Sequence, residues 1–405
     1  MNSSAKRRKK KLKILKNKSI LLGVSGGVAA YKSIELVRRL KQEGASVAVV
    51  MTDASRQFVT PLSLEIASQN KVYVSLFETP MAHIRLPSEA DLLIVAPATA
   101  NLIGKFANGI ADDLLSTCLL AYRGRVIVAP SMNWRMYENG MFQENLRKIA
   151  SLPNVIQVGP EKGDLACGEE GIGRMTDIED LVEAATAALS KKDLEGEKIV
   201  ITAGPTREYL DPVRFLSNRS SGKMGYALAR AARNRGAEVT LISGPSSLKR
   251  PGGVRFFQVE TGREMEEAVL REIREDTAAL IMTAAVADFS PVGKSASKIE
   301  KTEGLQLALR AVADIISSVA GRNKRPFIIG FAAETGNDVR RAAEKMKRKN
   351  MDMIVFNDVS EPGAGFDVDT NRVVIIDGAG EKDLPLAGKE SVAEAILDRF
   401  IEIRT

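Results

Sequence analysis

A chain of 405 residues, 44% of them hydrophobic and 27% charged, is long enough for two or three globular domains. No apolar run approaches the roughly 20 residues of a membrane-spanning helix, and the N-terminus lacks the apolar core of a secretion signal, so we expect a cytoplasmic protein without membrane contact. Two cysteines, Cys118 and Cys167, make neither a disulfide framework nor a zinc cluster.

The net charge of +7 comes from the N-terminus. Nine Lys and Arg residues and no acidic residue lie within residues 1–18, and the rest of the chain is slightly acidic. We predict a disordered basic tail over residues 1–18, with weak attraction to RNA or a membrane as the alternative. No nucleic-acid partner is expected for the folded part.

The first half alternates short apolar runs with amphipathic stretches, which predicts a parallel sheet with helices on both faces. An irregular glycine-rich flap, Gly159–Arg174, and a polar linker over residues 191–197 follow. The predicted strands are Ser19–Val24, Ser46–Met51, Asp91–Ala96, Arg125–Ala129 and Val155–Val158, and the predicted helices are Val28–Glu43, Ile103–Ala121 and Ile178–Leu189.

The second half repeats this alternation, so the chain reads as two doubly wound, Rossmann-like α/β domains over residues 19–190 and 198–405. The predicted strands are Ile199–Thr202, Glu238–Ile242, Ala278–Thr283, Phe327–Phe331, Met353–Phe356 and Arg372–Ile376. The predicted helices are Lys223–Arg235, Arg263–Arg274, Asp338–Lys349 and Ser391–Glu402.

Each half begins with a strand that runs into a loop of small residues before a helix. The loops are Leu22–Lys32, with Ser25, Gly26 and Gly27, and Ala203–Gly225. Such loops present backbone N–H groups and a helix N-terminus to an anion, usually a phosphate. We therefore expect two nucleotide-handling halves, with ligands beyond the carboxyl ends of the strands.

The only histidine, His83, is more often structural than functional when it stands alone. From an extended segment, Arg85 would point the same way as His83 and could hold an anionic substrate group. Cys118 lies in an apolar helical run and is expected in the core. Cys167 lies in the flap, where an accessible thiol suggests proton donation or nucleophilic work, with an inert surface cysteine as the alternative.

Residues Ala284–Phe289 follow a predicted strand of the second half. Their small side chains would let a nucleotide approach the backbone, and Asp288 could bridge a magnesium ion. Lys298 lies in the polar loop beyond. Lys345 and Lys349 share one helical face, for which a solvated basic surface is the alternative.

Together these motifs resemble the bifunctional coenzyme A biosynthesis family that fuses a phosphopantothenoylcysteine decarboxylase to a phosphopantothenate-cysteine ligase. The matching motifs in the first half are Gly23–Lys32, Pro97–Asn101, Pro130–Met136 and Ala166–Gly168. Those in the second half are Ile201–Glu208, Ser217–Gly225, Ala284–Asp288 and Gly330–Thr335.

For the first half the resemblance implies a flavodoxin-like flavoprotein domain in which FMN oxidises the substrate thiol to a thioaldehyde before carbon dioxide leaves. His83 would assist at the thiol and carboxylate, Asn133 would hold the carboxylate, and Cys167 would donate a proton. Arg85 and Met136 would contact the substrate. Residues lining FMN would be Ser25, Gly26, Gly27, Val28, Thr52, Ser55, Thr99, Ala100, Asn101 and Ser131.

For the second half it implies that 4'-phosphopantothenate is activated as an acyl nucleotide, from CTP in bacterial relatives, and then attacked by cysteine. Lys298 would bind the phosphates, Asn218 would orient the acyl intermediate, and Asp288 would hold Mg²⁺. Residues framing the nucleotide would be Ala284, Ala285, Asp314, Ile315, Phe331, Lys345 and Lys349. Ala311–Ile316 departs from the family's usual run before a helix and keeps its aspartate, which leaves CTP and ATP both open.

The resemblance also implies a homo-oligomer, with trimeric decarboxylase units and dimeric ligase domains. Two other functions fit the same loops. A nicotinamide-dependent oxidoreductase would use both glycine loops for NAD(P)H, and a regulatory flavoprotein would keep FMN without releasing carbon dioxide. His83 and Cys167 together argue against the regulatory protein.

Overall fold

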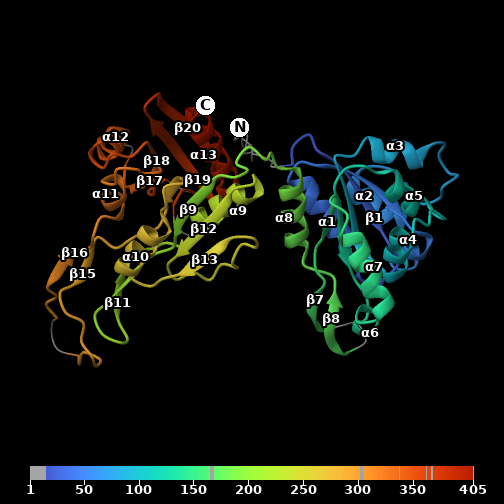
Figure 1. Ribbon diagram of the computed structural model, residues 1–405, viewed down its shortest axis with the longest axis horizontal. Coiled ribbons are helices and arrows are strands. Elements are labelled where there is room, and N and C mark those ends of the chain that lie inside the picture. The colour runs from blue at the N-terminus through green and yellow to red at the C-terminus, as the bar shows by residue number, and fades with distance from the viewer. Residues whose placement is uncertain are drawn as a thin grey trace, which may run out of the picture. The chain divides into compact units, whose positions relative to one another are not determined.

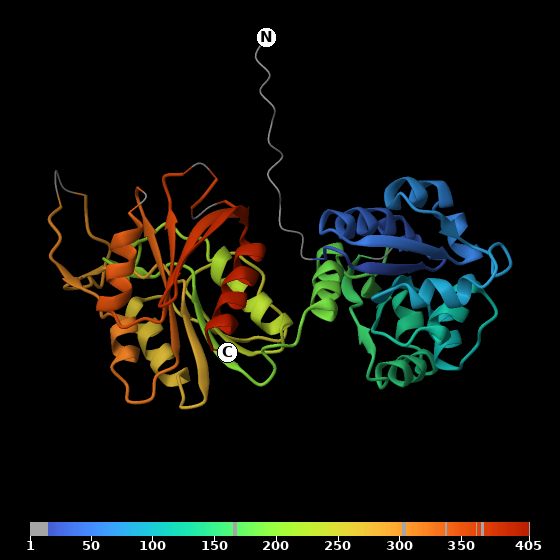
Figure 2. The same ribbon diagram turned by 90° about the horizontal axis from the view of Figure 1, so that it is seen from above.

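The computed structural model describes residues 15–164, 168–301, 305–336, 338–361, 363–365 and 368–404 (Figures 1 and 2). The backbone contacts divide the chain into two compact units, with the boundary between Ser190 and Lys191. We call them the first unit and the second unit. Within the described residues, no helix combines the length and apolar composition needed to cross a bilayer.

The predicted basic tail lies outside the described residues up to position 14, but residues 15–18 belong to the folded first unit. Leu15 is only 1% exposed and packs in the core, and its N–H donates to the Glu43 carbonyl oxygen at 2.9 Å. The prediction of a tail over these four residues is therefore wrong, because one leucine among the lysines is enough to anchor them.

The first unit is built on a six-stranded parallel sheet in the order β3-β2-β1-β4-β5-β6. This is the Rossmann order and confirms the Rossmann-like prediction; flavodoxin itself has the order 2-1-3-4-5. The strands are β1 (Ser19–Val24), β2 (Ser46–Met51), β3 (Val72–Tyr73), β4 (Leu92–Ala98), β5 (Val126–Pro130) and β6 (Val155–Gln157).

Helices cover both faces of this sheet, each over its own apolar cluster. Helices α1, α2 and α8 pack on one face, and α3, α4, α5 and α7 on the other. The helices are η1 (Val28–Tyr31), α1 (Lys32–Gln42), η2 (Asp53–Gln57), α2 (Pro61–Ser68), α3 (Ala82–Ser88), α4 (Ala100–Ala107), α5 (Leu114–Ala121), α6 (Trp134–Tyr137), α7 (Gly140–Ala150) and α8 (Ile178–Leu189).

Two expectations for the first unit need correction. The helix predicted over Ile103–Ala121 is two helices, because Gly109 adopts a φ of +68° and Asp113 then caps α5 through a capping box. The flap is not irregular throughout: β7 (Glu161–Asp164) and β8 (Glu170–Arg174) form an antiparallel hairpin on either side of residues 165–167.

The second unit is built on an eight-stranded sheet in the order β13-β12-β9-β14-β17-β18-β19-β20. The first six strands are parallel and repeat the Rossmann order, and β19 and β20 add an antiparallel edge. These strands are β9 (Lys198–Ala203), β12 (Glu238–Ser243), β13 (Arg255–Gln258), β14 (Thr277–Met282), β17 (Phe327–Glu334), β18 (Met353–Asp358), β19 (Thr370–Asp377) and β20 (Gly380–Gly388).

Helices α9 (Lys223–Asn234) and α13 (Lys389–Arg404) lie together on one face of the second sheet (Figures 1 and 2). The opposite face carries α10 (Gly262–Glu272), α11 (Ile315–Ala320) and α12 (Val339–Arg348). Two small antiparallel ribbons extend from the loops: β10 (Arg207–Tyr209) with β11 (Phe215–Ser217), and β15 (Phe289–Pro291) with β16 (Leu309–Ala311).

The start of the second unit is fixed by a buried guanidinium. Arg235 is 3% exposed and donates to both Asp193 carboxylate oxygens and to Asp398, each at 2.8 Å, and to Glu394 at 3.4 Å. Burial alone would lower the pKa of Arg235, but the Asp193 hydrogen bonds keep it above its usual value. The arginine therefore ties residue 193 to α13.

Replacing Arg235 with methionine is expected to lower the free energy of unfolding of the second unit by about 3–5 kcal/mol, because the carboxylates lose their buried partner. Arg263→Met is the matched control: the Arg263 side chain is 86% exposed and pairs with Glu267 at the surface, so its loss should cost less than about 0.5 kcal/mol. Urea unfolding followed by circular dichroism measures both. Equal losses in the two variants would contradict a structural role for Arg235.

Candidate active sites

The larger pocket, which we call the first pocket, lies in the first unit and has a volume of about 1070 Å³. It is formed by the loops after β1, β2, β4 and β5, at the carboxyl ends of the strands where the strand order reverses. The predicted residues that line it are Ser25, Gly26, Gly27, Val28, Thr52, Thr99, Ala100, Asn101, Ser131, Asn133 and Met136.

Ser25 joins two of these loops. Its side chain is 1% exposed, donates to the Pro97 carbonyl oxygen at 2.7 Å and accepts from the Thr99 N–H at 2.9 Å. Thr99 in turn caps α4, its hydroxyl accepting from the Leu102 N–H at 3.5 Å. The loops after β1 and β4 are therefore held together across the point where the strand order reverses.

Two observations show that the first pocket fits a flavin. The hydroxyl oxygen of Thr52 is buried there without a hydrogen-bond partner among the described residues, so a ligand can satisfy it. A Cβ on Gly26 would lie 2.6 Å from the Ala54 Cβ, so the loop after β1 closely approaches the loop after β2. Gly26 and Gly27 also line the pocket, and their lack of a side chain allows a phosphate to approach the backbone closely.

Three predicted residues of the first unit lie elsewhere. Ser55 is fully buried, and its hydroxyl donates to the Thr52 carbonyl oxygen at 2.7 Å. It therefore helps to hold the backbone of Thr52 in place. His83 and Arg85 do not line the first pocket. Nδ1 of His83 is buried without a hydrogen-bond partner in the described residues.

The expectation that His83 and Arg85 point the same way is wrong. Both lie on helix α3, where residues two apart face opposite sides. Arg85 instead donates to the Tyr73 hydroxyl at 3.1 Å and pairs with Glu89 at 3.3 Å, beside a small cavity of about 220 Å³. The Tyr73 contact, followed by Glu89, raises the pKa of Arg85.

The two cysteines have separate outcomes. Cys118 is buried on α5, where burial raises the pKa of its thiol to about 12, so the predicted core position is confirmed. Cys167 lies outside the described residues, and its predicted role as a proton donor stays a prediction.

Several cationic residues of the first pocket were not anticipated. Lys32 and Lys105 line it, as does Arg174 of β8. Lys105 pairs with Asp112 at 2.7 Å and with Asp113 at 2.9 Å. Lys32 could have been identified from the sequence, because it begins a helix that follows a glycine loop. Arg174 could not, because the hairpin that brings it to the pocket was not predicted.

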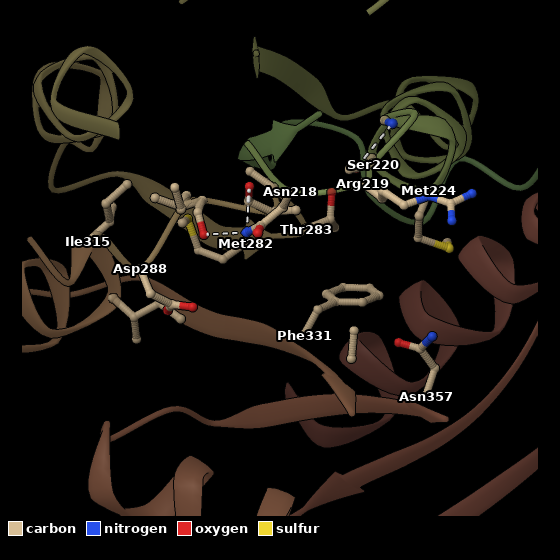
Figure 3. A pocket seen from close by; sticks show the side chains of 18 of the residues that line it. Asn218, Arg219, Ser220, Met224, Met282, Thr283, Asp288, Ile315, Phe331 and Asn357 are labelled. Carbon is tan, nitrogen blue, oxygen red and sulfur yellow. Dashed lines mark hydrogen bonds between the residues drawn. The ribbon is translucent and has the colours of Figure 1, made fainter. Parts of the chain in front are cut away.

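The second pocket has a volume of about 520 Å³ and occupies the corresponding place in the second unit, beyond β9, β14, β17 and β18 (Figure 3). The whole segment Asn218–Gly225 lines it, as predicted for a ligand-binding loop. The other predicted residues that line it are Ala284, Ala285, Asp288, Asp314, Ile315, Phe331, Lys345 and Lys349.

Asn218 fastens the glycine-rich loop to the loop after β14. Its side-chain amide donates to the carbonyl oxygens of Val286 at 3.0 Å and Ala285 at 3.4 Å (Figure 3). The backbone adds a bridge between Pro205 and Ala285. Both loops therefore keep a fixed spacing across the pocket.

One end of the second pocket carries paired charges. Lys349 forms an ion pair with Asp314 at 2.9 Å. Burial would raise the pKa of Asp314, but hydrogen bonds from Lys349 and Ser317 hold it below its usual value. Burial, followed by the neighbouring Lys349 ammonium, lowers the pKa of Lys345. An anionic ligand would relieve the crowding of these two lysines.

Lys298 does not line the second pocket; it is exposed in the loop beyond β15. The residue after it is firmly held: the Asp211 carboxylate accepts from the Ile299 N–H at 3.1 Å, and Arg214 donates to the Ile299 carbonyl oxygen. Burial would raise the pKa of Asp211, but the N–H groups of Ile299, Val213 and Arg214 lower it to about 2. The loop that carries Lys298 is thus anchored at one point.

No group of three or more His, Cys, Asp or Glu side chains in the described part of the chain is arranged to hold a metal ion. Asp288 and Asp314 both line the second pocket. Mg²⁺ in phosphate-binding sites is usually held by one or two carboxylates together with substrate phosphates, so these residues fit an ion that arrives with a nucleotide.

Three buried polar residues of the second pocket were not predicted. Asn357, Asn371 and Lys389 line it and are between 4% and 7% exposed. Asn357 follows the apolar run Met353–Phe356 near the end of β18, and a polar residue in that position is detectable in the sequence. Asn371 and Lys389 reach the pocket because β19 and β20 fold back antiparallel beside β18, and β20 was not predicted.

Comparison with known proteins agrees with this division of the chain. The flavoprotein family model matches residues 8–190, and the model of the DNA/pantothenate metabolism flavoprotein C-terminal domain matches residues 194–403. The predicted flavin-dependent character of the first half is thereby confirmed.

The chain is 47% identical over 397 residues to the coenzyme A biosynthesis bifunctional protein CoaBC of Escherichia coli K12, which covers 96% of this chain and 97% of that protein. It is 44% identical over 397 residues to CoaBC of Bacillus subtilis 168, with coverages of 96% and 97%. A crystal structure of a CoaBC C-terminal domain, 40% identical, covers 53% of this chain and 99% of its own, with a TM-score of 0.46.

These matches confirm the predicted family and the predicted pair of activities, a decarboxylase and a ligase. The chain belongs to the family of bifunctional coenzyme A biosynthesis proteins CoaBC, which join a flavoprotein decarboxylase domain to a phosphopantothenate-cysteine ligase domain.

Proposed function

We propose that the first pocket binds FMN and decarboxylates 4'-phosphopantothenoylcysteine, and that the second pocket makes this compound from 4'-phosphopantothenate, cysteine and CTP. The observation that carries the proposal is the repeated placement of the two pockets. Each lies where the strand order of a Rossmann-like sheet reverses, beside a glycine-rich loop.

In the first pocket, FMN when bound supplies the oxidation of the substrate thiol that makes loss of carbon dioxide feasible. Gly26 and Gly27 would allow close backbone approach, and Thr52 offers a hydroxyl that has no hydrogen-bond partner among the described residues. Asn133 caps the N-terminus of α6: its side-chain oxygen accepts from the Arg135 N–H at 2.9 Å, which fixes the side chain beside the pocket. We assign it the substrate carboxylate.

Two further roles in the first half are assigned from the family resemblance. Cys167 would donate the proton that completes the product. His83 would assist at the thiol and carboxylate, and its buried Nδ1, which has no partner in the described part of the chain, is available for a hydrogen bond. Since His83 does not line the pocket formed by its own chain, we propose that the decarboxylase acts as a trimer in which a neighbouring copy completes the site.

In the second pocket, the carboxylate of 4'-phosphopantothenate attacks the α-phosphate of CTP and releases pyrophosphate, and the cysteine amine then displaces CMP from the acyl carbon. Catalysis of both steps is mainly positioning and charge stabilisation. Lys345, Lys349 and Asp288 would hold the nucleotide and Mg²⁺, with Lys298 closing over the phosphates. Asn218 would orient the acyl intermediate. The active ligase would be a dimer, and the protein cytoplasmic.

The proposal is tested on the purified full-length chain by two measurements. A flavin absorbance spectrum, or uptake of added FMN, is expected, together with carbon dioxide release from 4'-phosphopantothenoylcysteine. Pyrophosphate release with 4'-phosphopantothenate and cysteine should be faster with CTP than with ATP. A protein that takes up NADPH but no FMN would contradict the first assignment, and equal rates with ATP would contradict the choice of CTP.

A further inference from the structure

One end of the second pocket is built differently from the end that carries Asp288 and Ile315. In Figure 3, Asn357 lies on the other side of Phe331 from these two residues. Asn371 and Lys389 line the same pocket, and Lys223 lines it at the N-terminus of α9. We call Asn357, Asn371, Lys389 and Lys223 the amide end.

Three members of the amide end, Asn371, Lys389 and Lys223, are tied together by the antiparallel edge of the sheet. Asn371 on β19 pairs with Ala387 on β20, two residues before Lys389. Lys223 forms an ion pair with Asp369 at 2.6 Å, and the backbone carbonyl oxygen of Asp369 accepts from the Lys389 N–H at 3.0 Å. Asn371, Lys389 and Lys223 are thus positioned by one local framework.

The side chain of Asn371 is incompletely satisfied by the protein. Asn371 is 5% exposed, yet its side-chain oxygen is buried and has no hydrogen-bond partner among the described residues. Buried amides in folded proteins nearly always have partners, and an exception calls for an explanation. Because Asn371 lines the second pocket, a ligand is the natural partner, and a half-turn of the amide presents either its oxygen or its N–H groups.

The charge at the amide end favours an anion. Lys389 is only 4% exposed, and its ammonium donates to the Gly365 carbonyl oxygen at 3.0 Å at the edge of the pocket. Helix α9 spans 12 residues and begins after Gly222, and its first residues, from Lys223 to Gly225, line the pocket. The positive end of the helix dipole and a buried ammonium both stabilise negative charge, and a phosphate most of all.

We propose that the amide end is a phosphate subsite, in which the Asn371 amide and the Lys389 ammonium bind a phosphate group of one of the two phosphorylated ligase substrates. The proposal rests on the ligase function proposed above for this pocket. Two sources share the chemistry: the triphosphate of the nucleotide and the phosphate ester of 4'-phosphopantothenate.

The test compares Asn371→Leu with a matched control, Asn234→Leu, in the full-length protein. Asn234 is also 5% exposed with an unpartnered side-chain oxygen, but it ends α9 and does not line the pocket. Loss of a hydrogen bond to a charged group should raise one KM about 10- to 100-fold in Asn371→Leu and leave both KM values of Asn234→Leu within about twofold of the parent.

The pattern of KM values identifies the source. A raised KM for 4'-phosphopantothenate, with a smaller preference over unphosphorylated pantothenate, assigns the subsite to the phosphate ester. A raised KM for CTP assigns it to the triphosphate. Asn371→Asp should exaggerate either effect, because its carboxylate repels the phosphate. Unchanged KM values for both substrates, or equal effects in the control, would overturn the proposal.

Calorimetric titration separates this proposal from the ligase function itself. CTP and 4'-phosphopantothenate are titrated singly into the parent chain and into Asn371→Leu. If the parent chain binds both compounds but does not turn them over, the proposed ligase function is wrong. The phosphate subsite is then tested by binding alone, and it is supported if Asn371→Leu binds one of the two compounds at least about 10-fold more weakly. Should Asn371→Leu fail to fold in a thermal melt, Asn371→Ser replaces it in every measurement.

Discussion

Replacing Gly26 with valine is expected to give a colourless protein with no measurable decarboxylation and an unchanged ligase rate. Even a Cβ at this position would lie 2.6 Å from the Ala54 Cβ and 2.8 Å from its carbonyl carbon. The clash is with backbone, which a side-chain rotation cannot relieve, so the loops after β1 and β2 must separate. The first pocket would lose its shape, and affinity for FMN should fall by at least about 100-fold.

The measurement is flavin absorbance per chain after addition of FMN, together with carbon dioxide release. Gly140→Val is the matched control in the same unit, since a Cβ at Gly140 meets nothing within 4 Å. The ligase rate of each variant reports whether the second unit has been disturbed. A yellow Gly26→Val protein with parental decarboxylation would show that this close approach is not needed for the cofactor.

Gly225→Val is expected to affect the other activity: the ligase reaction should be abolished, while the flavin stays bound. A Cβ at Gly225 would lie 2.5 Å from the Thr283 hydroxyl oxygen, 2.6 Å from the Ala203 Cβ and 2.9 Å from the Thr202 carbonyl oxygen. The first turn of α9 packs directly on the ends of β9 and β14, so valine must push the helix from the sheet. Overpacking of this kind costs about 1–3 kcal/mol, and the same shift displaces the loop that lines the second pocket.

Pyrophosphate release and the thermal midpoint of unfolding are measured for Gly225→Val and for Gly378→Val, where a Cβ meets nothing within 4 Å. We expect the ligase rate to fall by at least about 100-fold in the first variant and to stay within about twofold in the second. Parental ligase activity in Gly225→Val would mean that α9 can shift without harm to the site.

The buried strands and the main helices of both units were predictable because their sequences are locally consistent. The helix predicted over Ile178–Leu189 has those same bounds in the structure, and β2 likewise matches Ser46–Met51. Helix α3 was not predictable, since Pro87 and its short apolar face read as extended chain. Neither was β20, where exposed charged residues replace an apolar pattern.

The pocket loops could be predicted because small and polar residues at the ends of apolar strands are recognisable in the sequence. Nearly all predicted residues from such loops line the two pockets, from Ser25 to Asn133 and from Asn218 to Asp288. The pairing of His83 with Arg85 failed because it depended on the local backbone conformation. Asn371 and Lys389 were not predicted to line the pocket because their position depends on the pairing of β19 with β20, and these strands lie far from the glycine-rich loop in the sequence.

One of the two edge strands of the second sheet, β20, has a consequence for how copies of this protein can associate. β20 carries Glu381, Lys382 and Asp383 and then Pro385, which has no N–H to donate. Charges and a proline on an edge strand discourage a second chain from extending the sheet by backbone pairing. Self-association of the second unit should therefore not extend the sheet at β20, and continuous growth of the sheet through both of its edges is prevented.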